Sequence, residues 1–261
     1  MLTSAASEPS NPTATNLDWA GTAGYTAIVL DGLTEGTETG CIHGTAWYVH
    51  QLGARLLLHA GDIATTLPDA LTRAISEVAA QHQNTCDLHH PGSPCTTVTM
   101  IRHQANELEY LVLADSPLVI DTGGQPLVVI DEAEKEFSAT LERNARGGTT
   151  EEFLGLIHDQ QQYRNKSGGY WVAQVNPEAA HHALTGTVED ARGALLLSDG
   201  AALLVTEFHE LTWQGLLDLA YQSGPQELIN ATRKLEALDP DRTRWPRYKV
   251  SDDATAILCR L

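Results

Sequence analysis

The sequence lacks any long hydrophobic run: no apolar stretch in its 261 residues approaches the roughly 18 residues that suggest a membrane span. Basic side chains are also scarce, with 16 Lys and Arg against 34 Asp and Glu, which gives a formal net charge of −18. Such a surface repels nucleic acid and anionic membranes, because both bind basic patches. We therefore expect no nucleic acid and no membrane partner. The excess acid either gathers divalent cations or only keeps the protein soluble.

Cysteines are few, and their spacing matches no disulfide framework, which indicates a reducing, cytoplasmic location. The four cysteines are Cys41, Cys86, Cys95 and Cys259. The N-terminal residues have no basic region followed by an apolar one, so they do not resemble a secretory signal. We expect a disordered leader over residues 1–15 and a single folded domain over residues 16–261. We also expect the protein to be a monomer.

Motifs for several common enzyme classes are missing as well. The sequence has no G-x-S-x-G nucleophile elbow, no phosphate-binding P-loop and no H-E-x-x-H zinc motif. These absences leave the carboxylates as the residues most able to carry chemistry.

The expected elements favour an α+β fold. Residues 23–31 predict a strand, residues 45–60 predict two strands around a turn at 51–53, and residues 65–82 have the apolar spacing of a helix. Several short strands follow between residues 95 and 131, separated by turn signals. The later elements are a short helix at 176–184, a strand at 193–199, helices at 212–222 and 225–237, and a strand at 254–261. Antiparallel strands in groups, with helices in separate groups, are typical of α+β proteins.

Isolated aspartates lie at the ends of these apolar strands. Asp31 and Asp199 each follow an apolar run and precede a glycine, Asp115 interrupts a third run, and Asp252 begins a fourth. A buried carboxylate is costly unless it is paired or holds a metal. Carboxylates brought together from several strands would form an all-oxygen site, which suits Mg²⁺ or Mn²⁺.

The order of short motifs resembles the metal-dependent type 2C protein phosphatases, the PPM family, and most closely its compact bacterial members. The motifs are N-L-D at 16–18, V-L-D-G at 29–32, T-T-V-T-M-I-R at 96–102, L-A-D-S at 113–116, L-L-L-S-D-G at 195–200 and D-D-A-T at 252–255. The resemblance implies a four-layer α-β-β-α sandwich, in which two antiparallel sheets are flanked by helices and the metals lie at one end. It also implies a phosphorylated protein substrate, whose phosphoserine or phosphothreonine ester is attacked by metal-activated water.

The same resemblance implies roles for individual residues. Asp31 corresponds to the aspartate that bridges two metals, and the carbonyl of Gly32 to a backbone ligand of the second ion. Asp199 and Asp252 correspond to the carboxylates that hold the first ion. Asp18 corresponds to an aspartate that acts through metal-bound water, and Asp115 to one that contributes to a third, weaker site.

Some positions depart from the family pattern. Leu17 and Leu203 stand where family members often have acids, and the loop 31–40 lacks the usual glycines and histidine. No early arginine is present to bind phosphate. We therefore expect two Mn²⁺ or Mg²⁺ ions, the second held more weakly, with weaker grounds for a third. Glu35 or Glu38 would be a substitute ligand, and the alternative function is a degenerate, phosphoprotein-binding regulatory module.

Three other stretches offer competing interpretations. The residues Cys86, His89, His90 and Cys95 carry zinc-type ligands, but their spacing matches no common finger and favours an ordinary loop. The segment 140–170 lies where the family carries a mobile flap beside the active site. The arginines of the loop 239–250 are either phosphopeptide contacts or solvated side chains.

Overall fold

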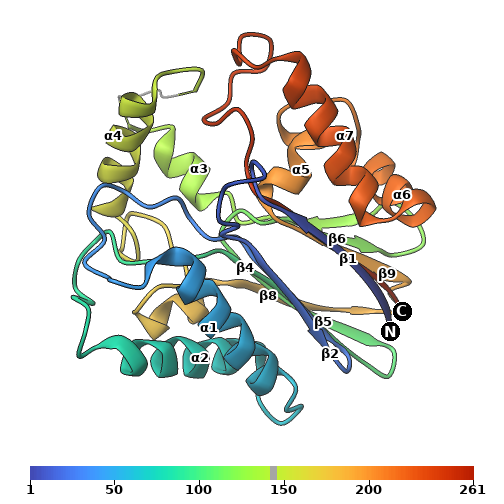
Figure 1. The fold of residues 1–261 in the computed structure, drawn as a ribbon. Helices are drawn as coiled ribbons and strands as arrows, with labels where there is room; N and C mark the ends of the chain where they lie inside the picture. The colour runs from blue at the N-terminus through green and yellow to red at the C-terminus, as the bar shows by residue number, and fades with distance from the viewer. Residues whose placement is uncertain (142–145) are drawn as a thin grey trace.

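Two antiparallel sheets form the centre of the protein, which we describe from a computed structural model over residues 1–141 and 146–261 (Figure 1). The first five-stranded sheet has the order β1 (Leu2–Glu8), β10 (Ala254–Arg260), β9 (Gly193–Leu197), β6 (Leu118–Asp121) and β7 (Leu127–Val129). The second has the order β2 (Trp19–Ala23), β3 (Thr26–Leu30), β4 (Val98–Gln104), β5 (Glu107–Leu113) and β8 (Leu184–Glu189). Each pair of neighbouring strands is antiparallel, so the predicted α+β class is confirmed.

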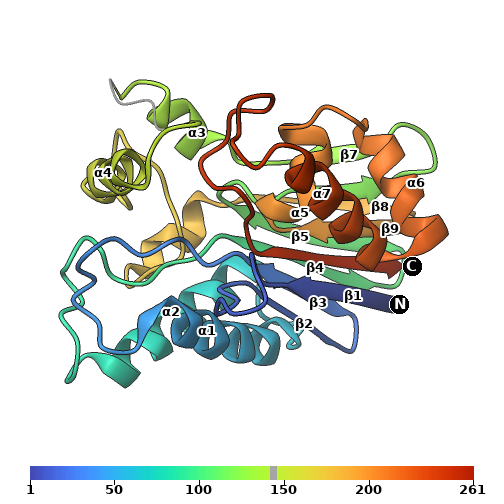
Figure 2. The same cartoon turned by 45° about the horizontal axis from the view of Figure 1, so that its top comes forward.

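Helices cover both outer faces of the sheet pair (Figure 2). The helices α1 (Gly44–Ala60) and α2 (Leu67–His82) lie on the sheet that contains β3, and α5 (Asp199–Thr206), α6 (Trp213–Ser223) and α7 (Pro225–Leu238) lie on the other. The shorter helices are α3 (Ala133–Ser138), α4 (Thr150–Gln161) and the 3₁₀ helix η1 (Pro177–His182). The expected four-layer α-β-β-α sandwich is confirmed. Within the described residues, no helix combines the length and apolar character needed to cross a membrane.

The strand β3 shows why its sequence is apolar without alternation. Ile28 and Leu30 pack against α1 and α2, whereas Ala27 and Val29 pack against the opposite sheet. All of these side chains are completely buried. A strand covered on both faces needs apolar residues at every position, and the polar residue that follows such a strand is placed at the edge of the core.

The helix α1 corrects the prediction of two strands over residues 45–60. Its buried positions include Tyr48, Val49, Leu52 and Leu56, which recur every three or four residues and form one helical face. Gly53, which we interpreted as a turn residue, lies inside the helix. A Cβ there would come within 2.5 Å of the Trp19 ring, so this glycine allows close packing and does not mark a turn.

The first residues also differ from the sequence prediction of a disordered leader over 1–15. Leu2 to Glu8 form β1, which pairs with β10 from Leu2 opposite Arg260 to Glu8 opposite Ala254. Within β1 only Ala6 is buried, because the strand is at the sheet edge and carries small polar residues. Its hydrophobic pattern is therefore too weak to be recognised without its partner.

Candidate functional site

The aspartates predicted from the sequence come together at one end of the sandwich. The start of β10, close after Asp252, lies at the end opposite the two chain termini (Figure 1). The five side chains are Asp18, Asp31, Asp115, Asp199 and Asp252, and we call them the acid cluster. All four others raise the pKa of Asp31 electrostatically, which places them around it. Segments more than 200 residues apart in sequence, around Asp18 and Asp252, thus contribute to one site.

Asp31 is fixed by the backbone at the end of β3. Its amide donates to Thr97 Oγ1 at 3.2 Å, and its carbonyl accepts from the Thr97 amide at 3.0 Å and from Thr96 Oγ1 at 2.8 Å. The side chain accepts from the amide of Asp199 through Oδ2 at 3.0 Å. Burial, and then the neighbouring acids with Asp199 first, raise the pKa of Asp31 well above its usual range.

Asp199 follows β9 as the first residue of α5, so it is at a helix start as well as a strand end. The next residue allows α5 to approach β10 closely. A Cβ on Gly200 would be 2.0 Å from the carbonyl oxygen of Asp253 and 3.4 Å from the Cβ of Asp252. Glycine is therefore required here to hold Asp199 and Asp252 side by side.

Asp18 is almost completely buried and has no cation partner within residues 1–141 and 146–261. Only 5% of the residue is exposed, and neither carboxylate oxygen has a hydrogen-bond partner of good geometry among the described residues. Burial raises its pKa to about 8; the nearby Thr255 and Ser198 hydroxyls lower the pKa, while Asp199 and Asp252 raise it further. A carboxylate without compensating donors is costly unless a cation neutralises it, so Asp18 fits a site built for metal.

Asp115 is presented by a strained backbone. The preceding residue, Ala114, has a φ of 67°, in the left-handed region that favours glycine. Ala114 is held there by its amide, which donates to Asp131 Oδ2 at 3.3 Å. Burial, followed by the charges of Asp199 and Glu134, raises the pKa of Asp115 to about 8. This backbone conformation positions Asp115 beside the other four aspartates of the acid cluster.

Gly32 lies close to the chain that carries Asp18. A Cβ at Gly32 would be 2.4 Å from the carbonyl oxygen of Leu17 and 2.7 Å from a methyl carbon of Thr45. A side chain would push the two segments apart. This close approach leaves the backbone of Gly32 beside the acid cluster, as expected for a backbone ligand.

A lysine that sequence reasoning missed lies inside the acid cluster. Lys249 Nζ is 2.6 Å from Asp252 Oδ1. Burial lowers the pKa of Lys249, but Asp252 and Asp199 outweigh it and raise the pKa above its usual range. Burial raises the pKa of Asp252 to about 6 although Lys249 acts in the opposite direction. The sequence offered only a basic loop before the final strand, with no periodicity to orient this side chain.

The loop that carries Lys249 is held by a buried ion pair. Arg247 Nη1 donates to Asp239 Oδ2 at 2.9 Å, and both side chains are at most 5% exposed. Burial opposes ionisation of Asp239, but the amides of Arg244 and Trp245 and the Arg247 guanidinium lower its pKa to about 2. Arg242 donates to the carbonyl of Tyr248 at 2.7 Å. Arg242 and Arg247 therefore organise the loop, and neither is a freely solvated side chain.

The remaining predicted residues have other positions. Asp253, next to Asp252, accepts from the amides of Ser10 and Leu17 at 2.7 Å each and ties the start of the chain to β10. Glu35 accepts from the amide of Thr45 at 2.5 Å and caps α1. Its carboxylate therefore stabilises a helix start, and the side chain of Glu38 is exposed.

Two adjoining cavities open beside the acid cluster, with volumes of about 530 and 140 Å³. Asp115, Asp199, Lys249 and Asp252 line both. Leu203, one turn after Asp199 on α5, lines the larger cavity. Of the segment 140–170 that we predicted as a flap, α4 contributes Phe153 and Leu156 to the smaller cavity, whereas residues 142–145 lie outside the described residues.

The fold is similar to that of solved bacterial phosphatases. The serine/threonine phosphatase PstP/Ppp of Mycobacterium tuberculosis matches with a TM-score of 0.62 at 16% identity, over 100% of this chain and 98% of that one. The PPM phosphatase MsPP of Mycobacterium smegmatis gives 0.56 at 18% identity, over 100% and 98%. PppA of Pseudomonas aeruginosa gives 0.58 at 15% identity, over 99% and 96%.

This chain has the fold of the PPM serine/threonine phosphatases. No protein-family model and no curated protein sequence matches it, so the likeness is one of three-dimensional structure. A second structure of PstP, its catalytic domain, is a complex with two manganese ions. In this chain the acid cluster is at one end of a PPM-fold sandwich, and its carboxylates are hard-oxygen donors suited to such ions.

Proposed function

We propose that this protein is a metal-dependent phosphatase of phosphoserine and phosphothreonine in proteins. The observation that carries the proposal is the acid cluster: five aspartates, four of them with raised pKa values, lie together at one end of a PPM fold. Asp31, Asp115, Asp199 and Asp252 line the two cavities beside it. Such a group of like charges is unfavourable by itself and becomes favourable when divalent cations bind.

Asp31, Asp199 and Asp252 would hold the first ion, and Asp31 with the carbonyl of Gly32 would hold the second. Asp115 would contribute to a third and weaker site. Bound Mn²⁺ or Mg²⁺ would supply a low-pKa water and neutralise negative charge on the phosphoryl group. Leu203 removes one possible carboxylate from the larger cavity, so we propose that the third site is the weakest.

The chain itself would orient the phosphate. Lys249 places an ammonium group among the acids, at the edge shared by both cavities. With Asp252 engaged by a bound metal, this ammonium would be able to donate to a phosphoryl oxygen, a role for which the sequence has no early arginine. Asp18 would accept a hydrogen bond from water, because its two oxygens are otherwise unpartnered among the described residues.

The substrate we propose is a phosphorylated protein, and the larger cavity of about 530 Å³ would accept the phosphorylated side chain and its flanking backbone. A net charge of −18 disfavours nucleic acid as a partner. We propose a monomer that acts in the cytoplasm.

The test is hydrolysis of an aryl phosphate and of a phosphothreonine peptide, with Mn²⁺ or Mg²⁺ and then with chelator. Asp31→Asn and Asp199→Asn should each reduce kcat/KM by about 100-fold or more, because bound metal supplies several kcal/mol. Asp121→Asn is the matched control: Asp121 also ends a strand, but at the far end of β6, where it accepts from Tyr221 at 3.1 Å.

Two outcomes would reject the enzyme. A wild-type protein that is silent at millimolar Mn²⁺ towards both substrates would not be a phosphatase. Binding of the phosphopeptide by that silent protein, measured by calorimetry and lost in Asp199→Asn, would establish the regulatory module instead.

A further inference from the structure

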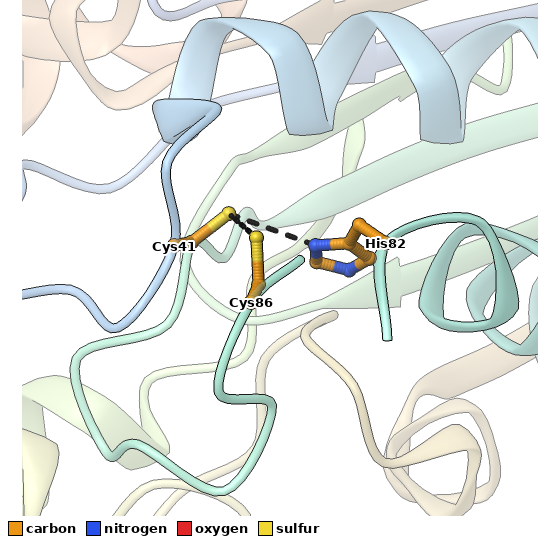
Figure 3. Close-up of side chains that lie close together, drawn as sticks. All are labelled: Cys41, His82 and Cys86. Atoms are coloured by element: carbon orange, nitrogen blue, oxygen red, sulfur yellow. Dashed lines mark hydrogen bonds between the residues drawn. The ribbon is translucent and has the colours of Figure 1, made fainter. Parts of the chain in front are cut away.

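A second group of metal-ligating side chains lies away from the acid cluster. Figure 3 shows Cys41, His82 and Cys86 turned towards one another. Their ligand atoms all lie within 4.8 Å of one another. Cys41 precedes α1, His82 is the last residue of α2, and Cys86 follows α2 in the next turn. Two segments therefore meet at this point: the end of α2 with the turn that follows it, and the loop that leads from Asp31 to α1.

The distances resemble the edges of a metal tetrahedron. The two sulfur atoms are 3.1 Å apart, and Cys41 Sγ is 3.6 Å from His82 Nδ1. Zinc bonds of about 2.3 Å to sulfur and 2.0 Å to nitrogen at tetrahedral angles give about 3.8 Å between sulfurs and about 3.5 Å from sulfur to nitrogen. The sulfur–nitrogen edge already has this length, and the sulfurs need to separate by less than an ångström.

The backbone holds this geometry. The Cys86 amide donates to the His82 carbonyl at 3.0 Å, which continues the α2 direction for one more turn and places both side chains on one side. Gly40, with a φ of 66°, passes so close to His90 that a Cβ would be 2.4 Å from the histidine Cβ. The Asp87 amide donates to the Gly40 carbonyl at 2.8 Å, and this hydrogen bond holds the adjacent Cys41 close to Cys86.

The ionisation of two of the three side chains also suits metal binding, whereas burial raises the pKa of Cys41. His82 is 1% exposed, and burial followed by the charge of His43 lowers its pKa, so the imidazole is neutral near pH 7. Nδ1, the ring nitrogen that faces Cys41 Sγ, would be the ligand atom. Burial opposes ionisation of Cys86, but Cys41 and the amides of Ile42 and His43 at the start of α1 outweigh it and lower the Cys86 pKa.

We propose that Cys41, His82 and Cys86 form a binding site for Zn²⁺, with the fourth position open to water. Binding would clamp the loop after Gly32 to the end of α2. The ligand set differs from the Cys86, His89, His90 and Cys95 group considered from the sequence, because Cys95 is buried in a separate cluster with Tyr170 and Val172.

The experiment measures zinc and cobalt directly and does not depend on phosphatase activity. Protein purified under a phosphine reductant should retain one equivalent of zinc after gel filtration with a weak chelator. Replacement by Co²⁺ should give a thiolate-to-cobalt charge-transfer band and the intense visible bands of a tetrahedral ion. Cys41→Ser and Cys86→Ser should each lower zinc affinity by at least tenfold and remove or weaken that band.

Two controls separate this site from the others. Cys95→Ser makes the same chemical change at a thiol outside the group, and Asp31→Asn disables the acid cluster; both should retain zinc and the cobalt spectrum. The proposal is overturned if reduced wild-type protein, reconstituted with Zn²⁺, retains no zinc and gives no charge-transfer band. It is also overturned if mass spectrometry finds a Cys41–Cys86 disulfide that reforms in the presence of zinc, which would make the thiols a redox pair.

Discussion

Lys249 and a divalent cation should compete for Asp252. In the structure the ammonium of Lys249 is 2.6 Å from Asp252 Oδ1 and supplies positive charge to the acid cluster. A metal bound by Asp252 would have to displace or repel that ammonium. We therefore expect Lys249→Met to destabilise the metal-free protein and to tighten Mn²⁺ binding.

The magnitude follows from the contact. A hydrogen bond to a charged group contributes about 1.5–3 kcal/mol. The side chains of Lys249 and Asp252 are 30% and 26% exposed, so solvent screening reduces this to about 1–2 kcal/mol. The free energy of unfolding of the metal-free variant should fall by about this amount. If that contact is lost on metal binding, Mn²⁺ affinity should rise by about 5- to 30-fold.

Urea unfolding in chelator measures the first effect, and calorimetric titration with Mn²⁺ measures the second. Lys249→Arg retains the charge and should remain close to wild type in Mn²⁺ affinity. Lys234→Met makes the same change at a lysine that is 70% exposed and paired with Glu227, and should change neither quantity. If Lys249→Met binds Mn²⁺ no more tightly than wild type, the lysine does not compete with metal.

Three further predictions concern residues that line or support the acid cluster. Leu203→Asp adds a carboxylate to the larger cavity and should lower the Mn²⁺ concentration for half-maximal activity about tenfold, or about 1.4 kcal/mol; an unchanged titration would show that the carboxylate does not reach the metal. Gly200→Ala places a Cβ 2.0 Å from the Asp253 carbonyl and should reduce stability by about 1–3 kcal/mol and weaken Mn²⁺ binding, whereas Gly215→Ala, with no atom nearer than 3.5 Å, should be neutral or stabilising in the same urea and Mn²⁺ titrations. The Asp239 pKa of about 2 lies below its unfolded value of about 3.9, so its stabilising effect is complete above pH 4 and is lost as the pH falls towards 2. The difference in urea midpoint between wild type and Asp239→Asn should therefore shrink over that range, and a constant difference would contradict the assignment.

The sequence could indicate Asp31, Asp115, Asp199 and Asp252 because each is next to an apolar run, whereas Asp18 was indicated only by the family resemblance. Asp31 follows a strand whose last four residues are apolar, and Asp199 follows the apolar strand β9, so each aspartate lies close to where a buried strand ends. The resemblance to the PPM motifs then predicted how the strands and helices are arranged, and the structure confirms that arrangement as a four-layer sandwich. Helix α2 could also be predicted from the sequence. Thr66 caps it by accepting a hydrogen bond from the Asp69 amide, and Pro68 is in its first turn.

Local patterns failed where a distant partner decides the conformation. β1 exposes most of its side chains and is a strand only because β10 pairs with it. Gly53 resembled a turn residue, yet it lies inside a helix, where the missing Cβ lets the Trp19 ring pack closely. The partner of β1 and the ring that covers Gly53 are both distant in sequence, so a window of neighbouring residues contains neither contact.

The composition, the order of buried strands and the positions of the acids were thus determined by the sequence itself, because burial periodicity and the cost of an isolated carboxylate are local properties. Only the tertiary structure placed Lys249 within 2.6 Å of Asp252, and only it brought Cys41 to His82 and Cys86. Those side chains come from irregular loops, whose paths are set by packing against distant elements and by single ion pairs such as that of Asp239.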